Sequence, residues 1–239
     1  FLTYLTSDQA KLELDDTLPR DLSFTAADVG IYTFGLFWSE NEIYKTNGDY
    51  RLTIEKGIEA FGVSDQFEVR EEADAYPLVI KANASLRREW KESRYHVGVK
   101  VGFQYADRVT EWHKHFALGG GSFASGFQAA EAAGEIGAGA TFELGKTYER
   151  QVSVSEKTER VWLTPYATVG AAFVQSRYDD PVDPLEYARD TTLVSASLGL
   201  RTKFRNWRVD VSYGLPVSGD SRFENGNSGR LAVSTLINW

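Results

Sequence analysis

The residues best suited to metal chemistry lie in one short stretch of the chain. His113 and His115 flank Lys114, and Glu111 lies two residues before His113. Imidazole and carboxylate groups bind zinc, but a zinc site needs three or four well-placed ligands. The same stretch contains Trp112, so an interfacial patch of aromatic and polar side chains is the alternative. We predict that no metal site forms here.

Acidic side chains in a second stretch could support general acid–base chemistry. They are Asp179, Asp180, Asp183 and Glu186. No nucleophile with an adjacent base can be assigned to them, and an acidic loop is usually only solvated. Residues 119–121 are three glycines, as in a phosphate-binding loop, but no Lys-Ser or Lys-Thr pair follows them. We therefore predict no enzyme activity, no catalytic residue and no cofactor.

The composition indicates the kind of scaffold that must position these residues. The 239 residues are 42% hydrophobic and 13% aromatic and include 21 Gly, which favours one folded all-β domain over residues 1–239. Cys is absent, which excludes thiol chemistry. The net charge of −8 argues against nucleic acid as a partner, because phosphates require a basic surface. Met is absent even at position 1, so we expect the chain to begin after processing or trimming.

Period-two alternation is the main structural signal in the sequence. Between residues 94 and 107 the apolar set is Tyr95, Val97, Val99, Val101, Phe103 and Tyr105, and the polar or small set is His96, Gly98, Lys100, Gly102, Gln104 and Ala106. This pattern is typical of a membrane-spanning β-strand with aromatic residues at both interfaces. It recurs around residues 50–58, 78–90, 136–144, 194–201, 207–215 and 231–239. No window approaches the roughly 18 consecutive apolar residues of a spanning helix.

The length of these segments separates two all-β classes. Several segments are longer than ten residues. The most common strand length in soluble proteins is about five or six residues, whereas a strand that crosses a membrane needs roughly nine to eleven residues. We therefore predict a transmembrane antiparallel up-and-down β-barrel of about ten strands in the bacterial outer membrane. A soluble β-sandwich or lipocalin-like barrel is the alternative class. Part of a larger barrel is the alternative size.

Connections of alternating length give a second indication of a barrel. Residues 91–94 and 205–206 form short turns, whereas residues 59–75, 108–130, 177–190 and 217–229 form long loops. Outer-membrane barrels have short periplasmic turns and long outer loops. Residues 146–159 are a long connection on the predicted periplasmic side, where we expect the strands to extend beyond the membrane. The alternation predicts nine strands, of which the first covers residues 29–39. Residues 1–14 can supply a tenth strand.

Charged residues on the polar face of these strands predict the character of the lumen. They have mixed sign and are Arg51, Glu55, Lys81, Arg87, Lys100, Glu135, Glu143, Arg201, Arg208 and Asp210. In a narrow barrel, opposite charges that face one another form ion pairs. We expect a salt-bridged lumen in place of a selective pore.

Four short motifs occur in the order found in one family of transporters. They are Leu118-Gly119-Gly120, Ala124-Ser125-Gly126-Phe127, Thr164-Pro165-Tyr166 and Tyr213-Gly214-Leu215-Pro216. On these motifs the chain, from about residue 76 to residue 239, resembles two-partner secretion transporters of the haemolysin-activator type, in the polypeptide-transport superfamily. The resemblance implies a barrel of about sixteen strands preceded by soluble domains, so this chain would be a reduced or partial relative.

The resemblance also assigns roles to individual positions. It implies a loop inserted into the lumen for binding or transport, containing Leu118, Gly119, Gly120, Ser125, Gly126 and Phe127, and a facing position on the barrel wall at Tyr166 and Gly170. In the family an Arg of this loop pairs with an Asp on the wall, and the corresponding residues here are Ser125 and Gly170. The loss of both is physically coherent, because the loss of one would leave an unpaired buried charge. We expect the loop to be held differently.

The end of the chain carries one further pattern. Leu231, Val233, Thr235, Ile237 and Trp239 share one face of the last strand. Alternating apolar residues before a terminal aromatic resemble the signal read by the outer-membrane insertion machinery, which we assign to Leu231, Val233, Ile237 and Trp239.

Three functions follow as hypotheses from these patterns. The first, implied by the resemblance, is an outer-membrane barrel that exports or anchors a partner protein at the cell surface. The second is a structural barrel of an envelope assembly that transports nothing. The third is an enzyme at the outer rim, for which His113, His115 and Asp183 are the candidate residues. The expected partners are outer-membrane lipid, a protein and the insertion machinery.

Overall fold

The computed structural model of the protein describes residues 2–8, 31–43, 46–57, 77–110, 114–121, 123–154, 157–177, 190–219 and 228–237. These residues form β-strands joined by turns and bends. None of them forms a helix long and apolar enough to cross a membrane.

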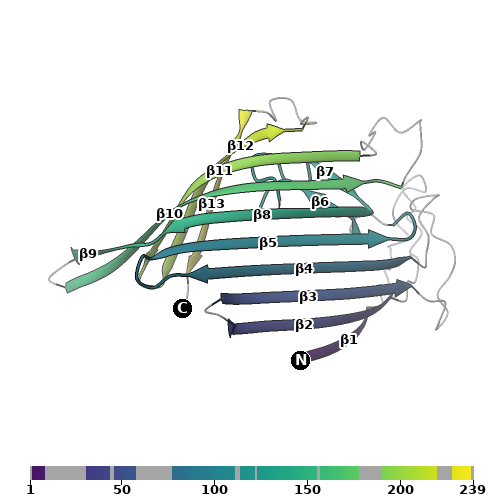
Figure 1. The fold of residues 1–239 in the computed structure, drawn as a ribbon, viewed down its shortest axis with the longest axis horizontal. Helices are drawn as coiled ribbons and strands as arrows, with labels where there is room; N and C mark the ends of the chain where they lie inside the picture. The colour runs from purple at the N-terminus through teal and green to yellow at the C-terminus, as the bar shows by residue number, and fades with distance from the viewer. Residues whose placement is uncertain are drawn as a thin grey trace, which may run out of the picture.

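Ten strands follow one another in a single antiparallel sheet (Figure 1). In order they are β1 (Leu2–Asp8), β2 (Ile31–Ile43), β3 (Thr46–Gly57), β4 (Leu78–Glu89), β5 (Tyr95–Ala106), β8 (Ile136–Lys146), β10 (Lys157–Gln175), β11 (Asp190–Phe204), β12 (Trp207–Ser218) and β13 (Arg230–Ile237). Each strand pairs with the next strand of this series, which confirms the predicted all-β, up-and-down architecture. Among the described residues, no pairing joins β1 to β13.

The two faces of the sheet differ in chemistry, as the alternation predicts. The register places Leu198 of β11 beside Tyr213 of β12, and Tyr213 beside Leu231 of β13. Leu198 and Leu231 are 69% and 66% exposed. The same face carries Val101, Phe103, Phe142, Leu144, Val169, Phe173, Leu200, Val211, Leu215 and Val233, all exposed. Soluble monomers rarely expose so continuous an apolar surface, and contact with lipid would cover it.

Strand β9 (Tyr148–Val154) extends β8 beyond the rim formed by the short turns (Figure 1). β8 and β9 follow one register along β10, because Gly145 pairs with Tyr166 and Tyr148 pairs with Leu163. The interruption between them is Thr147, which lies opposite Thr164 in this register and beside the position of Pro165, a residue with no N–H group to donate. Residues 146–159 therefore include a strand extension, as predicted, and β10 is 19 residues long.

The described part of the connection between β5 and β8 lies on the face of the sheet opposite the exposed apolar residues. There β6 (Phe116–Leu118) and β7 (Ala132–Gly134) form a separate antiparallel pair (Figure 1). We call residues 107–135 the lumen loop, and we call this polar face of the sheet the inner face. The main buried apolar cluster of the described residues lies between the lumen loop and the inner face.

Candidate functional site

Hydrogen bonds within the lumen loop determine the shape of its tip. The amide of Gly119 donates to the carbonyl oxygen of Phe123 at 2.9 Å, and the amide of Gly120 donates to that of Phe127 at 3.1 Å. Gly119 and Gly120 have φ angles of 90° and 68°, in the region that favours glycine. Two glycines of the first motif are therefore needed for the fold of the loop itself.

The second motif forms a turn that lies against the barrel wall. The amide of Phe127 donates to the carbonyl oxygen of Ala124 at 3.0 Å, which closes the turn around Ser125 and Gly126. A Cβ atom on Gly126 would overlap the backbone of β12. A Cβ atom on Gly214 of β12 would lie 2.7 Å from the carbonyl oxygen of Ser125. Loop and wall approach this closely because both positions lack a side chain.

Glycines on the inner face make room for two aromatic rings of the loop. A Cβ atom on Gly102 of β5 would lie 2.7 Å from the ring of Phe123, and one on the neighbouring Gly139 of β8 would overlap the same ring. A Cβ atom on Gly137 would overlap the ring of Phe116. The two rings stack with their centroids 5.6 Å apart. We call Gly102, Gly137 and Gly139 the glycine slot.

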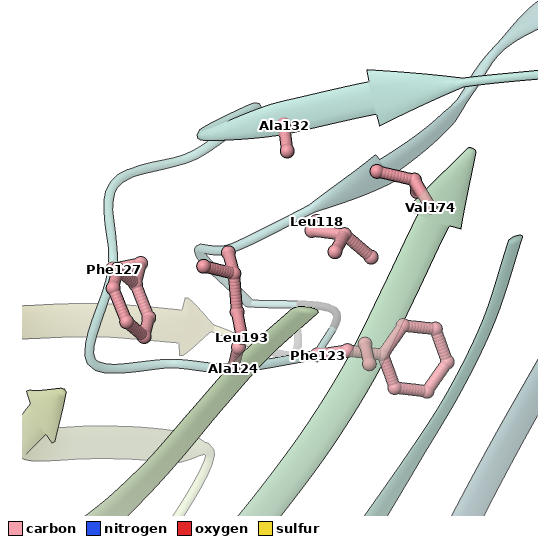
Figure 2. Close-up of a cluster of buried hydrophobic side chains, with 8 residues drawn as sticks. Leu118, Phe123, Ala124, Phe127, Ala132, Val174 and Leu193 are labelled. Carbon is pink, nitrogen blue, oxygen red and sulfur yellow. The ribbon is translucent and has the colours of Figure 1, made fainter. Parts of the chain in front are cut away.

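Apolar contacts continue from the glycine slot to the next strands of the wall. The buried cluster consists of Leu118, Phe123, Ala124, Phe127 and Ala132 from the loop with Ala172, Val174 and Leu193 from β10 and β11 (Figure 2). In Figure 2 the Phe123 ring lies beside β10, away from Phe127, so the loop is anchored at two separated points. Burial of apolar surface holds the loop in place.

Ser125 and Gly170 are the positions that the motif resemblance assigns to a charge pair. A Cβ atom on Gly170 would lie 3.2 Å from the amide nitrogen of Ala124, so Gly170 faces the loop, one residue away from Ser125. Tyr166, four residues along β10, does not take part in the apolar cluster. Its hydroxyl group donates to Asp210 of β12 at 2.6 Å. The predicted wall position thus divides into a loop contact at Gly170 and a polar contact at Tyr166.

Contacts between charged side chains and His96 connect six strands of the inner face, β3, β4, β5, β8, β11 and β12. The carboxylate of Glu143 lies 2.8 Å from His96 Nε2, 3.3 Å from Arg201 Nη1 and 3.5 Å from Arg87 Nη1. Arg201 Nε also donates to Asp210 at 2.9 Å. On β3 and β4, Lys81 pairs with Glu55 at 3.0 Å. Part of the predicted set of inward charges therefore forms salt bridges within the wall.

Glu135 fastens the end of the lumen loop. Its carboxylate is fully buried, lies 3.2 Å from His115 Nε2 and accepts the backbone amide of Arg177 at 2.9 Å. Arg177 Nε donates in turn to the carbonyl oxygen of Ala106 at 2.9 Å. Burial by itself raises the pKa of Glu135, but His115 and the Arg177 amide outweigh it and hold this pKa at about 2.

Most of the remaining predicted residues lie outside the described part of the chain. No three His, Cys, Asp or Glu residues of the described chain could hold a metal ion together. Glu111, His113, Asp179, Asp180, Asp183, Glu186 and Trp239 lie outside the described residues. Leu231 and Val233 are exposed on the apolar face of β13, and Ile237 is its last residue.

Comparison with known proteins adds one result about the fold. No family model matches the chain, and no curated protein sequence matches it. A structure search finds CdiB from Escherichia coli, a two-partner secretion transporter, with a TM-score of 0.67 and 19% sequence identity. The fold is similar to that of CdiB. The match covers 93% of this chain and 38% of CdiB, so the chain spans well under half of the length of CdiB.

At the level of the fold, the similarity to CdiB confirms the resemblance that the motifs indicate. Sequence reasoning identified the loop but missed its main anchors, Phe116 and Phe123, and the glycine slot. A signal was present, because Gly102, Gly137 and Gly139 all occupy polar-face positions of their strands. Only the register, which places Gly102 opposite Gly139, shows that they form one surface.

Proposed function

We propose that the protein is a barrel of the bacterial outer membrane that exports or anchors a partner protein at the cell surface, and that the lumen loop is the element that controls this step. The observation that carries the proposal is the docking of the loop on the glycine slot through Phe123. The exposed apolar face and the CdiB-like fold support it.

The chemistry of the contact suits a loop that can leave and return. Phe123 and Phe127 hold the tip by burial, and among the described residues no ion pair joins the tip at residues 123–127 to the wall. Movement of the tip therefore does not leave an unpaired charge in the lumen. The ion pairs around Glu143 lie within the wall and can stay in place while the tip moves.

The test compares proteins that protease releases from the surface of intact cells. Phe123→Ala removes the ring from the glycine slot, and we expect the amount of the displayed partner to change several-fold. Gly121→Ala is the matched control in the same loop, because a Cβ atom there meets nothing within 4 Å. An unchanged set of surface proteins after Phe123→Ala, and also after deletion of residues 114–134, would contradict the proposal.

A structural barrel that transports nothing is the second candidate. It is favoured by the lumen loop, which occupies the inner face, and by the ion pairs that tie the wall together. In this case the loop is a permanent part of the core, and its deletion should lower the free energy of unfolding without changing surface display.

Insertion into the membrane is a further part of the proposal. The last strand would be recognised through Leu231, Val233, Ile237 and Trp239 by the outer-membrane insertion machinery, and its apolar face would then contact lipid. The exposure of Leu231 and Val233 on that face supports this role.

A further inference from the structure

The hairpin of β9 and β10 extends beyond the turns on both sides of it. β8 pairs with β5 as far as Lys146 and Tyr95, and beyond that point β9 pairs with β10 alone. β10 pairs with β11 only from Val161 onward. The outer edge of β9 is therefore a seven-residue strand edge with no strand beside it among the described residues. At about 3.3 Å per residue its length is about 23 Å.

The register shows which backbone groups this edge presents. The amide of Thr147 donates to the carbonyl oxygen of Arg94, on the β5 side, at 2.9 Å. Because β8 and β9 keep one register along β10, amides two residues apart point the same way. The amides of Glu149, Gln151 and Ser153 therefore point away from β10, to the open edge. The edge has no Pro, Gly or Lys to interrupt pairing, and its charged side chains are Glu149 and Arg150.

Ion pairs to both flanking turns hold the hairpin in position. Glu149 lies 3.2 Å from Arg94 in the turn before β5 and 3.5 Å from Arg160 across the hairpin. Glu159 lies 2.9 Å from Arg205 in the turn between β11 and β12. A strand edge that is already ordered loses little conformational entropy when it binds another strand.

An open hollow of about 470 Å³ lies beside this edge, where an added strand would run. It is lined by residues 92–94 of the turn and residues 146–150 of the chain. Three of its lining residues are basic, Arg94, Lys146 and Arg150, and two are acidic, Glu92 and Glu149. Glu149 is already paired with Arg94, whereas Arg150 is exposed and has no ion pair in the described part of the chain. A carboxylate of the added strand would complement Arg150.

We propose that the outer edge of β9 binds an extended, acidic segment of the polypeptide that the barrel exports or anchors, as an added β-strand. This inference rests on the proposed function for the identity of the polypeptide, but not for the binding itself. The backbone of Glu149, Gln151 and Ser153 provides the hydrogen bonds, and Arg150 selects the acidic side chain.

The experiment measures fluorescence anisotropy of a labelled peptide with the purified native protein in detergent. The peptide alternates Thr and Val and has an Asp at its centre, and a second peptide has Lys in place of Asp. Gln151→Pro removes an outward amide and leaves the bonds to β10 intact, whereas Gln151→Val keeps the amide. Arg150→Glu reverses the charge beside the hollow.

We expect the wild-type protein and Gln151→Val to bind the Asp peptide alike, and Gln151→Pro to bind it at least tenfold more weakly. Arg150→Glu should prefer the Lys peptide. Equal binding by Gln151→Pro and Gln151→Val, or no binding of either peptide to the wild-type protein, overturns the inference. Surface display is read separately, so peptide binding without export would contradict the proposed function and leave this inference standing.

Discussion

Two glycines on the inner face of β5, four residues apart, have opposite surroundings. A Cβ atom on Gly98 would meet its nearest neighbour at 3.5 Å, which is an ordinary contact, whereas one on Gly102 would lie 2.7 Å from the Phe123 ring. Gly98→Ala should therefore leave the stability unchanged or raise it by up to about 1 kcal/mol, because Ala restricts the unfolded chain. Gly102→Ala should lower it by about 1–3 kcal/mol through overpacking.

The free energy of unfolding in detergent micelles measures this difference, and limited proteolysis shows whether the lumen loop has left the wall. In a Phe123→Ala background, Gly102→Ala should cost much less than it does in the wild type, because the ring that the added methyl group would overlap is absent. The same effect of both glycine substitutions would contradict the assignment of the glycine slot.

Acidification tests the carboxylate at the end of the loop. The folded-state pKa of Glu135 is about 2, below its ordinary value of 4.5. Its ionised form therefore stabilises the fold above pH 4.5, and this contribution, on the order of 3 kcal/mol, is lost as the pH falls from about 4.5 to 2. Glu135→Gln should be less stable than the wild type at pH 6, and the difference should shrink toward pH 2.

Denaturant titrations at pH 6, 4 and 2.5 give this comparison. Glu159→Gln, which changes a more exposed pair with Arg205, is the control and should keep the pH dependence of the wild type. A constant difference between Glu135→Gln and the wild type at all three pH values would show that Glu135 does not act through its charge.

At the scale of the element, a charged substitution on the outward face of β11 tests whether this face contacts lipid. Leu198 is 69% exposed and lies between apolar neighbours on β10 and β12. Leu198→Arg should cost about 2–4 kcal/mol if this face is at the middle of the bilayer. On a soluble strand the same change would be nearly neutral.

Folding into lipid vesicles, followed by unfolding in guanidinium, measures this cost. Leu198→Ile is the matched control, and it should stay within about 1 kcal/mol of the wild type. Leu198→Arg with the stability of Leu198→Ile would favour a soluble β-sheet protein.

At the scale of the whole molecule, we predict that the lumen loop limits ion conduction through the barrel. Its buried cluster and the ion pairs of the wall occupy the inner face. We expect small or no currents from the wild-type protein in planar bilayers, and larger currents after deletion of residues 114–134. Phe123→Ala should give intermittent openings, because the tip is released while Glu135 at the end of the loop stays bound to the backbone amide of Arg177. Large, steady currents from the wild-type protein would contradict a docked loop.

The sequence predicted the elements well and their contacts less well. Alternation located β4, β5, β8, β11 and β12, because a strand between lipid and lumen must place apolar and polar side chains on opposite faces. The motifs located the lumen loop through Leu118 and Phe127. The pairing of His115 with Glu135, 20 positions apart in the chain, follows from no local pattern, and neither does the meeting of Arg201 with Glu143.

The sequence by itself determined the class of fold, the up-and-down order and the inner and outer faces of the strands, since these depend on period two and on the order of turns. The tertiary structure decided what holds the loop. Register brings Gly102 and Gly139 side by side, and loop closure brings Phe123 onto them. A glycine has no side chain whose chemistry would predict its neighbour. The role of the space above Gly102 and Gly139 is therefore known only when the structure shows that Phe123 fills it.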